Sequence, residues 1–499
     1  MITTITERIR EMSQEYGKKI AVSMGDWFIN YNELVVEIDK EAQKLKKAGV
    51  KEGMRIIIVL PNHWHTLRLI LGCFQIGAIP LLLSPKYPPK SVEKIFQNAN
   101  ASLLIAQTPH QELADRLPFA FIGENGEISF PDKINAAVDD LPSFDSPIAA
   151  FFSTSGTTGI PKLVMLTHKN ILSDIDSCFD LVDIYPEDRM LGVLPMFHVF
   201  GFSIAYILPL AKGMTLTIVP SLYPANNLIE SLKKYQSTVF LGVPAVFSIL
   251  AGARAKVPFD LSPLRLPICG GDALPQRVRE AFEKGFGLNI MEGYGITEAS
   301  PVVSINPSPL TRVPGSAGPV IKAINLKIVD DNDKELPAGE IGEIILSGDP
   351  ISPGYYNNPE ENQISFRNQW FYTGDLGKID EKGLLYIEGR KKELIIVSGF
   401  NVFPQEIEEV IMSYPGVART AVVGVQRASR GEMIKAYVVP NENTTIDPAE
   451  IVRFCRKELA SHKVPRIVEI VAELPQTVTG KVMKFMISST GNEIEVNEE

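Results

Sequence analysis

The sequence predicts an α/β protein with a large N-terminal domain of doubly wound, mixed or parallel sheets and a small α+β C-terminal domain. Apolar, strand-like segments alternate with amphipathic helices over the first 300 residues, as parallel strands with crossover helices require. Several predicted strands end in glycine-rich or polar residues, and open parallel sheets bind their ligands at that edge. A length of 499 residues is too great for one ordinary core and is enough for two or three domains.

The elements of the first 300 residues follow from the spacing of apolar side chains. Tyr31 to Ala48 carries Leu34, Ile38 and Leu45 at helical intervals, which predicts a helix with one buried face. The other predicted helices are Leu67–Ile76, Lys169–Leu181 and Ala225–Tyr235. The predicted strands are Arg55–Leu60, Ile79–Leu83, Leu103–Ala106, Met190–Leu194, Thr215–Val219, Val239–Gly242, Leu266–Gly270 and Asn289–Glu292.

The pattern of apolar and turn-forming residues changes after residue 315. Residues 315–387 carry short alternating strands separated by turns, which predicts a smaller β-rich unit. A charged cluster, Gly389 to Glu393, marks the next boundary, although a basic run of this kind is also typical of a solvated turn. About one hundred further residues can form an independent domain. Its predicted elements are the helices Glu406–Met412 and Pro448–Leu459 and the strands Ala421–Val425 and Ala436–Val439.

Composition excludes some classes of protein. The apolar fraction of 45% and charged fraction of 22% are typical of a globular protein, and the net charge of −10 gives no support to a nucleic-acid or anionic-membrane partner. Met1 to Lys19 lacks the apolar core of a signal peptide, and the most apolar windows are interrupted by Gly and Pro. We therefore expect no transmembrane segment and a cytoplasmic protein. The four cysteines are far apart, which predicts core residues rather than disulfides or a zinc site.

The most informative stretch follows the apolar run Ile148 to Phe152. It reads Ser153-Thr-Ser-Gly-Thr-Thr-Gly-Ile-Pro-Lys162, so the predicted strand is followed by glycines, hydroxyl side chains and one lysine. Such a loop presents backbone N–H groups, short donors and a cation to a polyphosphate. It is not a Walker loop, because Pro161 directly precedes the lysine and Leu163 follows it. A polar surface turn is the alternative for a Gly/Ser/Thr cluster.

The order Ser-Gly-Thr-Thr-Gly-x-Pro-Lys resembles the phosphate loop of the adenylate-forming superfamily, which contains acyl-CoA ligases, firefly luciferase and the adenylation domains of peptide synthetases. This resemblance implies that the loop binds ATP. The nucleotide-binding residues it implies here are Thr154, Ser155, Gly156, Thr157, Thr158, Gly159 and Lys162. Gly271 and Asp272, which follow another predicted strand at the ligand-binding edge of the sheet, are further candidates.

A second signature, Tyr294-Gly295-Ile296-Thr297-Glu298, also resembles the superfamily. An aromatic ring can stack on adenine, and a threonine hydroxyl can donate to the α-phosphate. The resemblance makes Tyr294, Gly295 and Thr297 nucleotide-binding residues, and Thr297 and Glu298 catalytic residues. Glu298 is the expected Mg²⁺ ligand, because this ion prefers oxygen ligands. Taken alone, the same letters are typical of a strand-to-helix turn capped by Thr297.

Three further motifs lie in the C-terminal half. Trp370-Phe-Tyr-Thr-Gly-Asp375 matches the signature whose aspartate accepts hydrogen bonds from the ribose, although Asp375 would also suit a turn or cap. Arg390 resembles the arginine that reaches the ribose and phosphates, and Lys392 falls at the hinge position of the family. The motif Leu474-Pro-Gln-Thr-Val-Thr-Gly-Lys481 resembles the tail that supplies the catalytic lysine, which neutralises charge on phosphorus during adenylation.

The resemblance covers roughly residues 31–481, with its motifs in the expected order, and implies an adenylate-forming fold. Its domains would be residues 1–389, a hinge at 390–393 and a C-terminal lid at 394–499. Two departures stand out: Leu163 replaces the usual glycine after the loop lysine, and the chain after Lys481 reads Val-Met-Lys-Phe-Met where relatives are arginine-rich.

The tract Tyr386 to Glu409 is similar to bacterial fatty acyl-CoA ligases, which implies a two-step activity with ATP, Mg²⁺ and CoA. A fatty acid would form acyl-AMP, and the small domain would then rotate about Lys392 to admit CoA. His198 could be a packing residue, but the resemblance implies that it is a catalytic residue that gates the carboxylate pocket. The segments expected to line the acyl pocket are apolar apart from His198: Phe197–Phe202, Val243–Phe247 and Ala299–Val303.

Other activities stay open. Within the superfamily these are an acyl-AMP ligase that passes its acyl group to a carrier protein and an aryl-acid CoA ligase; the stretch Gly431 to Ala436 favours CoA modestly. A different class is a catalytically silent protein that binds nucleotide or fatty acid. The joint presence of five motif residues argues against it: Lys162, Glu298, Asp375, Arg390 and Lys481. A homodimer is an expectation by analogy alone.

Overall fold

The computed structural model describes residues 3–134, 141–142, 144–154, 161–221, 225–256, 259–397, 400–427, 431–476 and 482–488. The chain divides into two compact units. The first is drawn from Met1–Gly271, Phe282–Asn325 and Leu346–Phe371, and the second from Asp272–Ala281, Leu326–Ile345 and Tyr372–Glu499. The α/β class with mixed sheets and a smaller β-rich C-terminal part is confirmed; the domain boundary at residues 390–393 stays a prediction.

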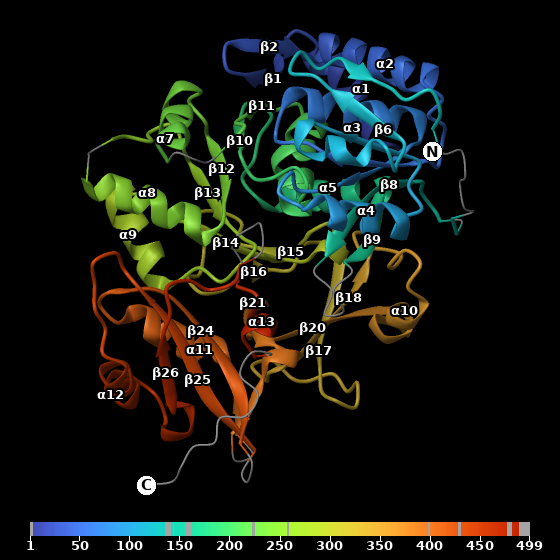
Figure 1. Ribbon diagram of the computed structural model, residues 1–499. Coiled ribbons are helices and arrows are strands. Elements are labelled where there is room, and N and C mark those ends of the chain that lie inside the picture. The colour runs from blue at the N-terminus through green and yellow to red at the C-terminus, as the bar shows by residue number, and fades with distance from the viewer. Residues whose placement is uncertain are drawn as a thin grey trace. The chain divides into compact units, whose positions relative to one another are not determined.

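An eight-stranded sheet forms one half of the first unit (Figure 1). Its spatial order is β15 (Val302–Ile305), β14 (Met291–Gly295), β13 (Leu266–Cys269), β12 (Val239–Gly242), β10 (Arg189–Gly192), β11 (Thr215–Ile218), β1 (Ile20–Met24) and β2 (Trp27–Asn30). The six central strands run parallel, and only the edge strands β2 and β15 pair antiparallel with their neighbours. The predicted parallel strands are therefore confirmed.

A seven-stranded sheet forms the other half. Its order is β7 (Ile128–Ser129), β6 (Phe119–Ile122), β5 (Leu103–Ala106), β3 (Arg55–Val59), β4 (Ile79–Leu82), β8 (Ile148–Thr154) and β9 (Lys162–Thr167). Every residue of β3, β4 and β5 is buried, as near-continuous apolar runs in parallel sheets require. On one face Val92, Ile95 and Phe96 of helix α4 (Pro89–Asn98) join the core formed by these strands.

The helices of the first unit begin where the sequence supplies caps. Helix α2 (Tyr31–Lys47) starts after Asn30, which forms a reciprocal capping box with Glu33, and α5 (His168–Leu181) starts after Thr167 in the same way. The others are α1 (Ile5–Tyr16), α3 (Trp64–Ile76), α6 (Leu208–Ala211), α7 (Ala225–Lys234), α8 (Pro244–Lys256) and α10 (Pro359–Ser365), while α9 (Gln276–Phe286) begins in the second unit and ends in the first. Figure 1 shows α8 beside α9, where Phe247 and Phe282 meet edge to face at 5.1 Å between ring centroids.

Three local structures differ from the prediction. Strand β14 begins at Met291, two residues later than predicted, and continues through Gly295, because Gly293 to Gly295 pair with the antiparallel β15. A single 3₁₀ turn, η3 (Thr297–Ala299), follows in place of a helix, and its N-cap is Ile296, so the reading of Thr297 as a helix cap is wrong. A π-helical segment, Phe200–Ile207, was also not predicted.

The second unit has its own core. Strands β24 (Val417–Arg427), β25 (Gly431–Pro440) and β26 (Ile467–Ile470) form a sheet that packs against α11 (Pro404–Ser413) and α12 (Pro448–Glu458). The remaining elements are β22 (Ile395–Val397), β23 (Phe400–Val402) and α13 (Lys484–Ser488). Further strands are β16 (Gly318–Pro319), β17 (Ile324–Val329), β18 (Gly342–Gly348), β19 (Phe366–Arg367), β20 (Trp370–Ile379) and β21 (Leu384–Arg390). These short strands confirm the β-rich prediction.

Two further predictions concern isolated features. All four cysteines are buried and none forms a disulfide, as predicted for core residues. Across the described ranges, no helix combines the length and the apolar character needed to cross a membrane.

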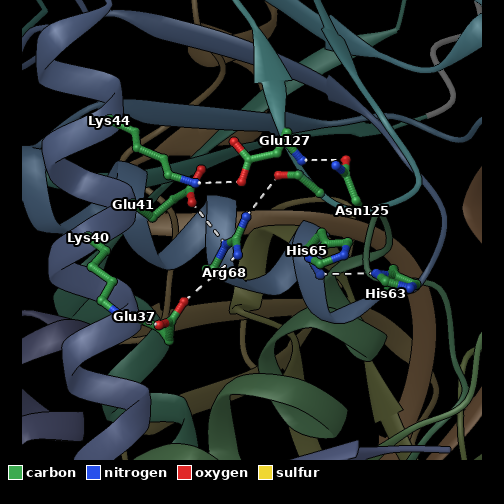
Figure 2. Close-up of polar contacts among 10 residues, drawn as sticks. Glu37, Lys40, Glu41, Lys44, His63, His65, Arg68, Asn125 and Glu127 are labelled. Atoms are coloured by element: carbon green, nitrogen blue, oxygen red, sulfur yellow. Dashed lines mark hydrogen bonds and ion pairs between the residues drawn. The ribbon is translucent and has the colours of Figure 1, made fainter.

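A cluster of charged side chains joins α2 to α3 and to the turn at residues 123–127 (Figure 2). Arg68 Nε lies 2.9 Å from Glu41 Oε2, and Arg68 Nη2 donates to the carbonyl of Gly126 at 2.9 Å. Glu127 Oε1 lies 3.5 Å from Nζ of Lys44, which belongs to α2. We call these residues, together with Glu37 and the neighbouring His63 and His65, the Arg68 cluster.

Candidate active site

The two ends of the predicted phosphate loop lie opposite each other. Thr154, the last residue of β8, is paired in register with Lys162, the first residue of the antiparallel β9. This hairpin confirms a strand directly before the loop. The loop residues Ser155, Gly156, Thr157, Thr158 and Gly159 lie outside the described residues.

Main-chain hydrogen bonds join the segment of residues 352–356 both to the beginning of β9 and to Glu298. Val164 forms an antiparallel bridge with Tyr355, and Tyr356 N donates to the Leu163 carbonyl at 2.8 Å. Ser352 N donates to the carbonyl of Glu298 at 2.7 Å. Lys162 from the first signature and Glu298 from the second are therefore held near one tyrosine-bearing segment, residues 352–356.

The Tyr355 side chain contacts residues of both signatures. Its hydroxyl donates to Glu298 Oε1 at 2.7 Å, and Lys162 Nζ lies 4.9 Å from the centroid of its ring. Lys162 also forms an ion pair with Glu361 of α10, and Ser365 Oγ donates to the same Glu361 oxygen at 3.0 Å. We call Lys162, Glu298, Tyr355 and Glu361 the Tyr355 cluster.

The tyrosine is held as a hydrogen-bond donor. Its side chain is buried, and burial, followed by the nearby Glu298 carboxylate, raises the pKa of the Tyr355 phenol well above its ordinary value. The neutral phenol therefore persists through the physiological pH range. It keeps one Glu298 oxygen in a fixed position.

Sequence reasoning missed Tyr355 and Glu361. They belong to no quoted motif, and Tyr355 is 57 residues from Glu298 in the chain. The available local signal was Asn358-Pro359, which starts α10: Asn358 is its N-cap and Pro359 its first residue. That signal predicts a helix but not which side chains its first turn brings to Lys162.

The side chains suit a magnesium ion that arrives with a nucleotide. Within the part of the chain that the structure describes, no group of three or more His, Cys, Asp or Glu side chains could hold a metal ion. Mg²⁺ is usually bound by one or two carboxylates together with substrate phosphates and water, so the single oriented carboxylate of Glu298 fits this mode. Its role as a metal ligand stays a prediction.

Apolar side chains gather around the turn that follows β13. A Cβ atom added at Gly270 would lie 3.2 Å from the ring of Phe200, and one at Gly271 would lie 3.5 Å from Val243 Cγ1. Two of the three segments predicted to line an acyl pocket, Phe197–Phe202 and Val243–Phe247, therefore reach this turn. His198, two residues before Phe200, is half-buried, and its Nδ1 accepts from Phe200 N at 3.3 Å.

Other predicted residues are placed as follows. Gly271 has φ +84°, a conformation that favours glycine, and the Asp272 carboxylate accepts from Ala273 N at 2.9 Å. Tyr294 is half-buried on β14. Gly295 must be glycine, because an added Cβ would lie 2.4 Å from the carbonyl of Pro301. Thr297 begins the turn η3, next to Glu298.

In the second unit, the structure brings together two predicted nucleotide-binding residues. Asp375 and Arg390 are register partners on β20 and β21, and Arg390 Nε lies 3.1 Å from Asp375 Oδ1. The aspartate side chain is buried and the arginine side chain is half exposed, so the pair reaches the surface. Lys392 lies in the 3₁₀ turn η4 (Lys391–Glu393). Lys481 lies outside the described residues.

Comparison with known proteins agrees with this architecture. The ATP-bound MatB from Rhodopseudomonas palustris superposes with a TM-score of 0.89 at 30% identity, over 98% of this chain and 99% of that one. A long-chain-fatty-acid–CoA ligase of Bacillus subtilis is 30% identical over 96% of this chain and 93% of its own length. A feruloyl-CoA synthase of Amycolatopsis is 32% identical over 93% and 94%.

Family models identify the class. Residues 9–356 match the AMP-binding enzyme model, and residues 406–481 match the AMP-binding enzyme C-terminal domain. The chain therefore belongs to the AMP-binding enzyme family, within the adenylate-forming superfamily that its motifs resemble.

Proposed function

We propose that the protein activates a fatty acid with ATP and joins it to coenzyme A. In the first half-reaction a carboxylate oxygen of the acid attacks the α-phosphorus of ATP, which gives acyl-AMP and releases pyrophosphate. In the second, the thiolate of CoA attacks the acyl carbonyl and AMP leaves with the electron pair of the broken C–O bond. Activation is needed because a carboxylate is a poor electrophile.

The Tyr355 cluster carries the adenylation part of the proposal. It places a cation and an oriented carboxylate at the ends of two signatures, as binding of a polyphosphate with its counter-ion requires. In this proposal Lys162 and the loop residues bind the phosphates, Glu298 holds Mg²⁺, and Thr297 donates to the α-phosphate. When bound, the metal neutralises charge on the phosphates.

The remaining motif residues receive the roles that the family resemblance implies. Tyr294 and Gly295 face the base, Gly271 and Asp272 belong to the same nucleotide site, and Asp375 with Arg390 binds the ribose. Lys481 stabilises the charge on phosphorus during adenylation, and His198 gates the carboxylate pocket. Rotation of residues 394–499 about a hinge at 390–393, centred on Lys392, would withdraw Lys481 and open a channel for the CoA thiol.

The apolar wall around Gly270 is the observation that supports an acid with an apolar tail. Phe200 and Val243 contact that turn, and their segments contain no charged side chain apart from the titratable His198. An amino acid would need a partner for its ammonium group, which these segments do not supply. The long-chain-fatty-acid–CoA ligase relatives favour an alkyl tail.

An aryl acid is the second candidate, because one relative of comparable identity is a feruloyl-CoA synthase. An aromatic ring would pack equally well against Phe200. Transfer of the acyl group to a carrier protein is a third outcome that the experiment below separates from the first two.

The test is pyrophosphate release with ATP and Mg²⁺ across saturated fatty acids of increasing length, benzoates, cinnamates and amino acids, each with and without CoA. Release that requires a fatty acid and turns over only with CoA supports the proposal and locates the preferred chain length. Preference for a cinnamate or benzoate would assign the aryl activity. A single burst that CoA does not extend would indicate a carrier-protein acceptor, and binding of ATP and acid without any release would indicate a silent binder.

A further inference from the structure

The ion pair between Lys162 and Glu361 places a carboxylate on the cation that the proposed function assigns to the phosphates of ATP. We propose that Glu361 is a competing counter-ion for Lys162. We also propose that Tyr355 is a positioning residue that keeps Lys162 and Glu298 in place while Lys162 exchanges Glu361 for a phosphate. This inference rests on the proposed function and adds two residues that no motif contains.

The exchange is energetically accessible because the pair is only partly buried. The exposed fractions of the Lys162 and Glu361 side chains are 22% and 25%, so water screens their attraction. A polyphosphate carries more negative charge than one carboxylate and forms stronger charge-assisted hydrogen bonds. Glu361 keeps the hydrogen bond from Ser365 after Lys162 leaves, so its carboxylate is not left without a donor.

Tyr355 is anchored independently of both charged partners. Its N–H donates to Asn362 Oδ1 at 2.8 Å, and its carbonyl accepts from Asn362 Nδ2 at 2.8 Å. Its ring packs edge to face on Phe366 at 5.6 Å between centroids. The backbone and the ring therefore fix the position of the hydroxyl, which donates to Glu298 Oε1.

Two conservative variants separate these roles. Glu361→Gln removes the negative charge and keeps an oxygen that can accept from Ser365. Its matched control is Glu360→Gln, which makes the same charge change at an exposed neighbour in the first turn of α10. Tyr355→Phe removes one oxygen atom and keeps the packed ring. Its matched control is Tyr356→Phe, whose ring contacts Phe151.

The measurement is equilibrium binding of α,β-methylene-ATP by isothermal titration calorimetry, at constant ionic strength and over a series of Mg²⁺ concentrations. We expect Glu361→Gln to bind the nucleotide about two- to fivefold more tightly than wild type, the range of a partly exposed ion pair, and Glu360→Gln to change affinity less. Tyr355→Phe should raise the Mg²⁺ concentration for half-maximal binding by about tenfold, because a hydrogen bond to a charged group is lost.

Three results would overturn the inference. One is unchanged or weaker nucleotide binding by Glu361→Gln, another is an equal gain in Glu360→Gln, and the third is an unaltered Mg²⁺ dependence in Tyr355→Phe. If wild type binds the nucleotide with Mg²⁺ and the variants behave like it, the inference fails, while the proposed function is unaffected and is decided by pyrophosphate release. If wild type does not bind the nucleotide, the proposed function fails and takes the inference with it.

Discussion

The Arg68 cluster and the Tyr355 cluster both pair a basic side chain with a carboxylate, but the two pairs differ in burial and in the elements that carry them. The exposed fractions of the Arg68 and Glu41 side chains are 11% and 1%, and both residues sit on long helices. Lys162 and Glu361 are about a quarter exposed and lie at the start of a strand and in a short helix. A closed pair on rigid elements stabilises the fold, whereas an open pair beside a loop can change partners.

Packing around Arg68 shows how strongly the first pair is enclosed. Helix α3 carries Gly72 where α2 passes, and an added Cβ there would lie 2.9 Å from Glu41 Cγ. The glycine lets the two helices approach closely enough to exclude water from the carboxylate. By contrast, the Lys162 side chain stays 22% exposed although its Nζ lies 4.9 Å from the centroid of the Tyr355 ring.

The largest expected effect is on stability, from Glu41→Ala. The variant removes the nearer carboxylate from the buried Arg68 and leaves it the more distant Glu37, whose Oε2 lies 3.8 Å from Arg68 Nη1, so the free energy of unfolding should fall by about 3 kcal/mol, the lower end of the cost of breaking a buried ion pair. Urea denaturation followed by tryptophan fluorescence measures this, because Trp64 lies on α3 and packs against Trp27 at 4.9 Å. Lys40→Ala, which removes an exposed side chain from the same helix, is the control and should change stability by less than about 0.5 kcal/mol.

A further variant sharpens this prediction. Replacing both partners, Glu41→Leu with Arg68→Met, should restore most of the lost stability, because no charge is then left unpaired. Equal losses of unfolding free energy in the single and double variants would show that the unpaired charge is not the cause of the destabilisation.

The next effect is on activity, from Glu298→Gln. This substitution keeps an acceptor for Tyr355 but removes the charge proposed to hold Mg²⁺, so acid-dependent pyrophosphate release should slow by about 10²- to 10³-fold. The half-buried side chain contributes little to the core, so the urea midpoint should stay within the range of Glu360→Gln. A large loss of stability with an unchanged rate of pyrophosphate release would mean that Glu298, like Arg68, stabilises the fold and does not hold Mg²⁺.

The two clusters also show what the sequence can predict. The strand Ile148–Thr154 and the lysine at the far end of the loop were predictable, because an uninterrupted apolar run must be buried and glycines with hydroxyls cannot continue it. The partners of that lysine were not, since they depend on the bridge between Val164 and Tyr355, nearly 200 residues away in the chain. Nor was Arg68 predictable, because its charge lies within an apolar helix pattern and its partner belongs to another helix.

Family resemblance supplied what spacing could not. Asp375 and Arg390 were named from motifs 15 residues apart, and the structure makes them register partners on adjacent strands. The π-helical segment after His198 had no local signal, because its apolar residues suit any buried helix. Long-range pairing is thus the information that is missing from a single sequence.

The smallest expected effect concerns pH and distinguishes the clusters once more. Burial, followed by the neighbouring His63 and Arg68 cations, lowers the pKa of His65 to about 4. Between pH 6.5 and 4, His65 is therefore protonated in the unfolded chain but stays neutral in the folded protein. The stability due to neutral His65 is complete above pH 6.5 and is lost as the pH falls through this window. The Tyr355 hydroxyl, whose pKa is raised, does not titrate there.

We therefore expect the melting temperature of wild type to fall as the pH is lowered from 7 to 4.5, and His65→Gln to reduce that slope, measured by thermal unfolding under matched ionic strength. Tyr355→Phe should leave the slope unchanged, which makes it the control from the other cluster. The Arg68 cluster would then respond to acid through stability, while the Tyr355 cluster responds to nucleotide and metal. An identical slope in wild type and His65→Gln would mean that other carboxylates and histidines, such as the buried His168 whose pKa is also lowered to about 4, account for the acid sensitivity.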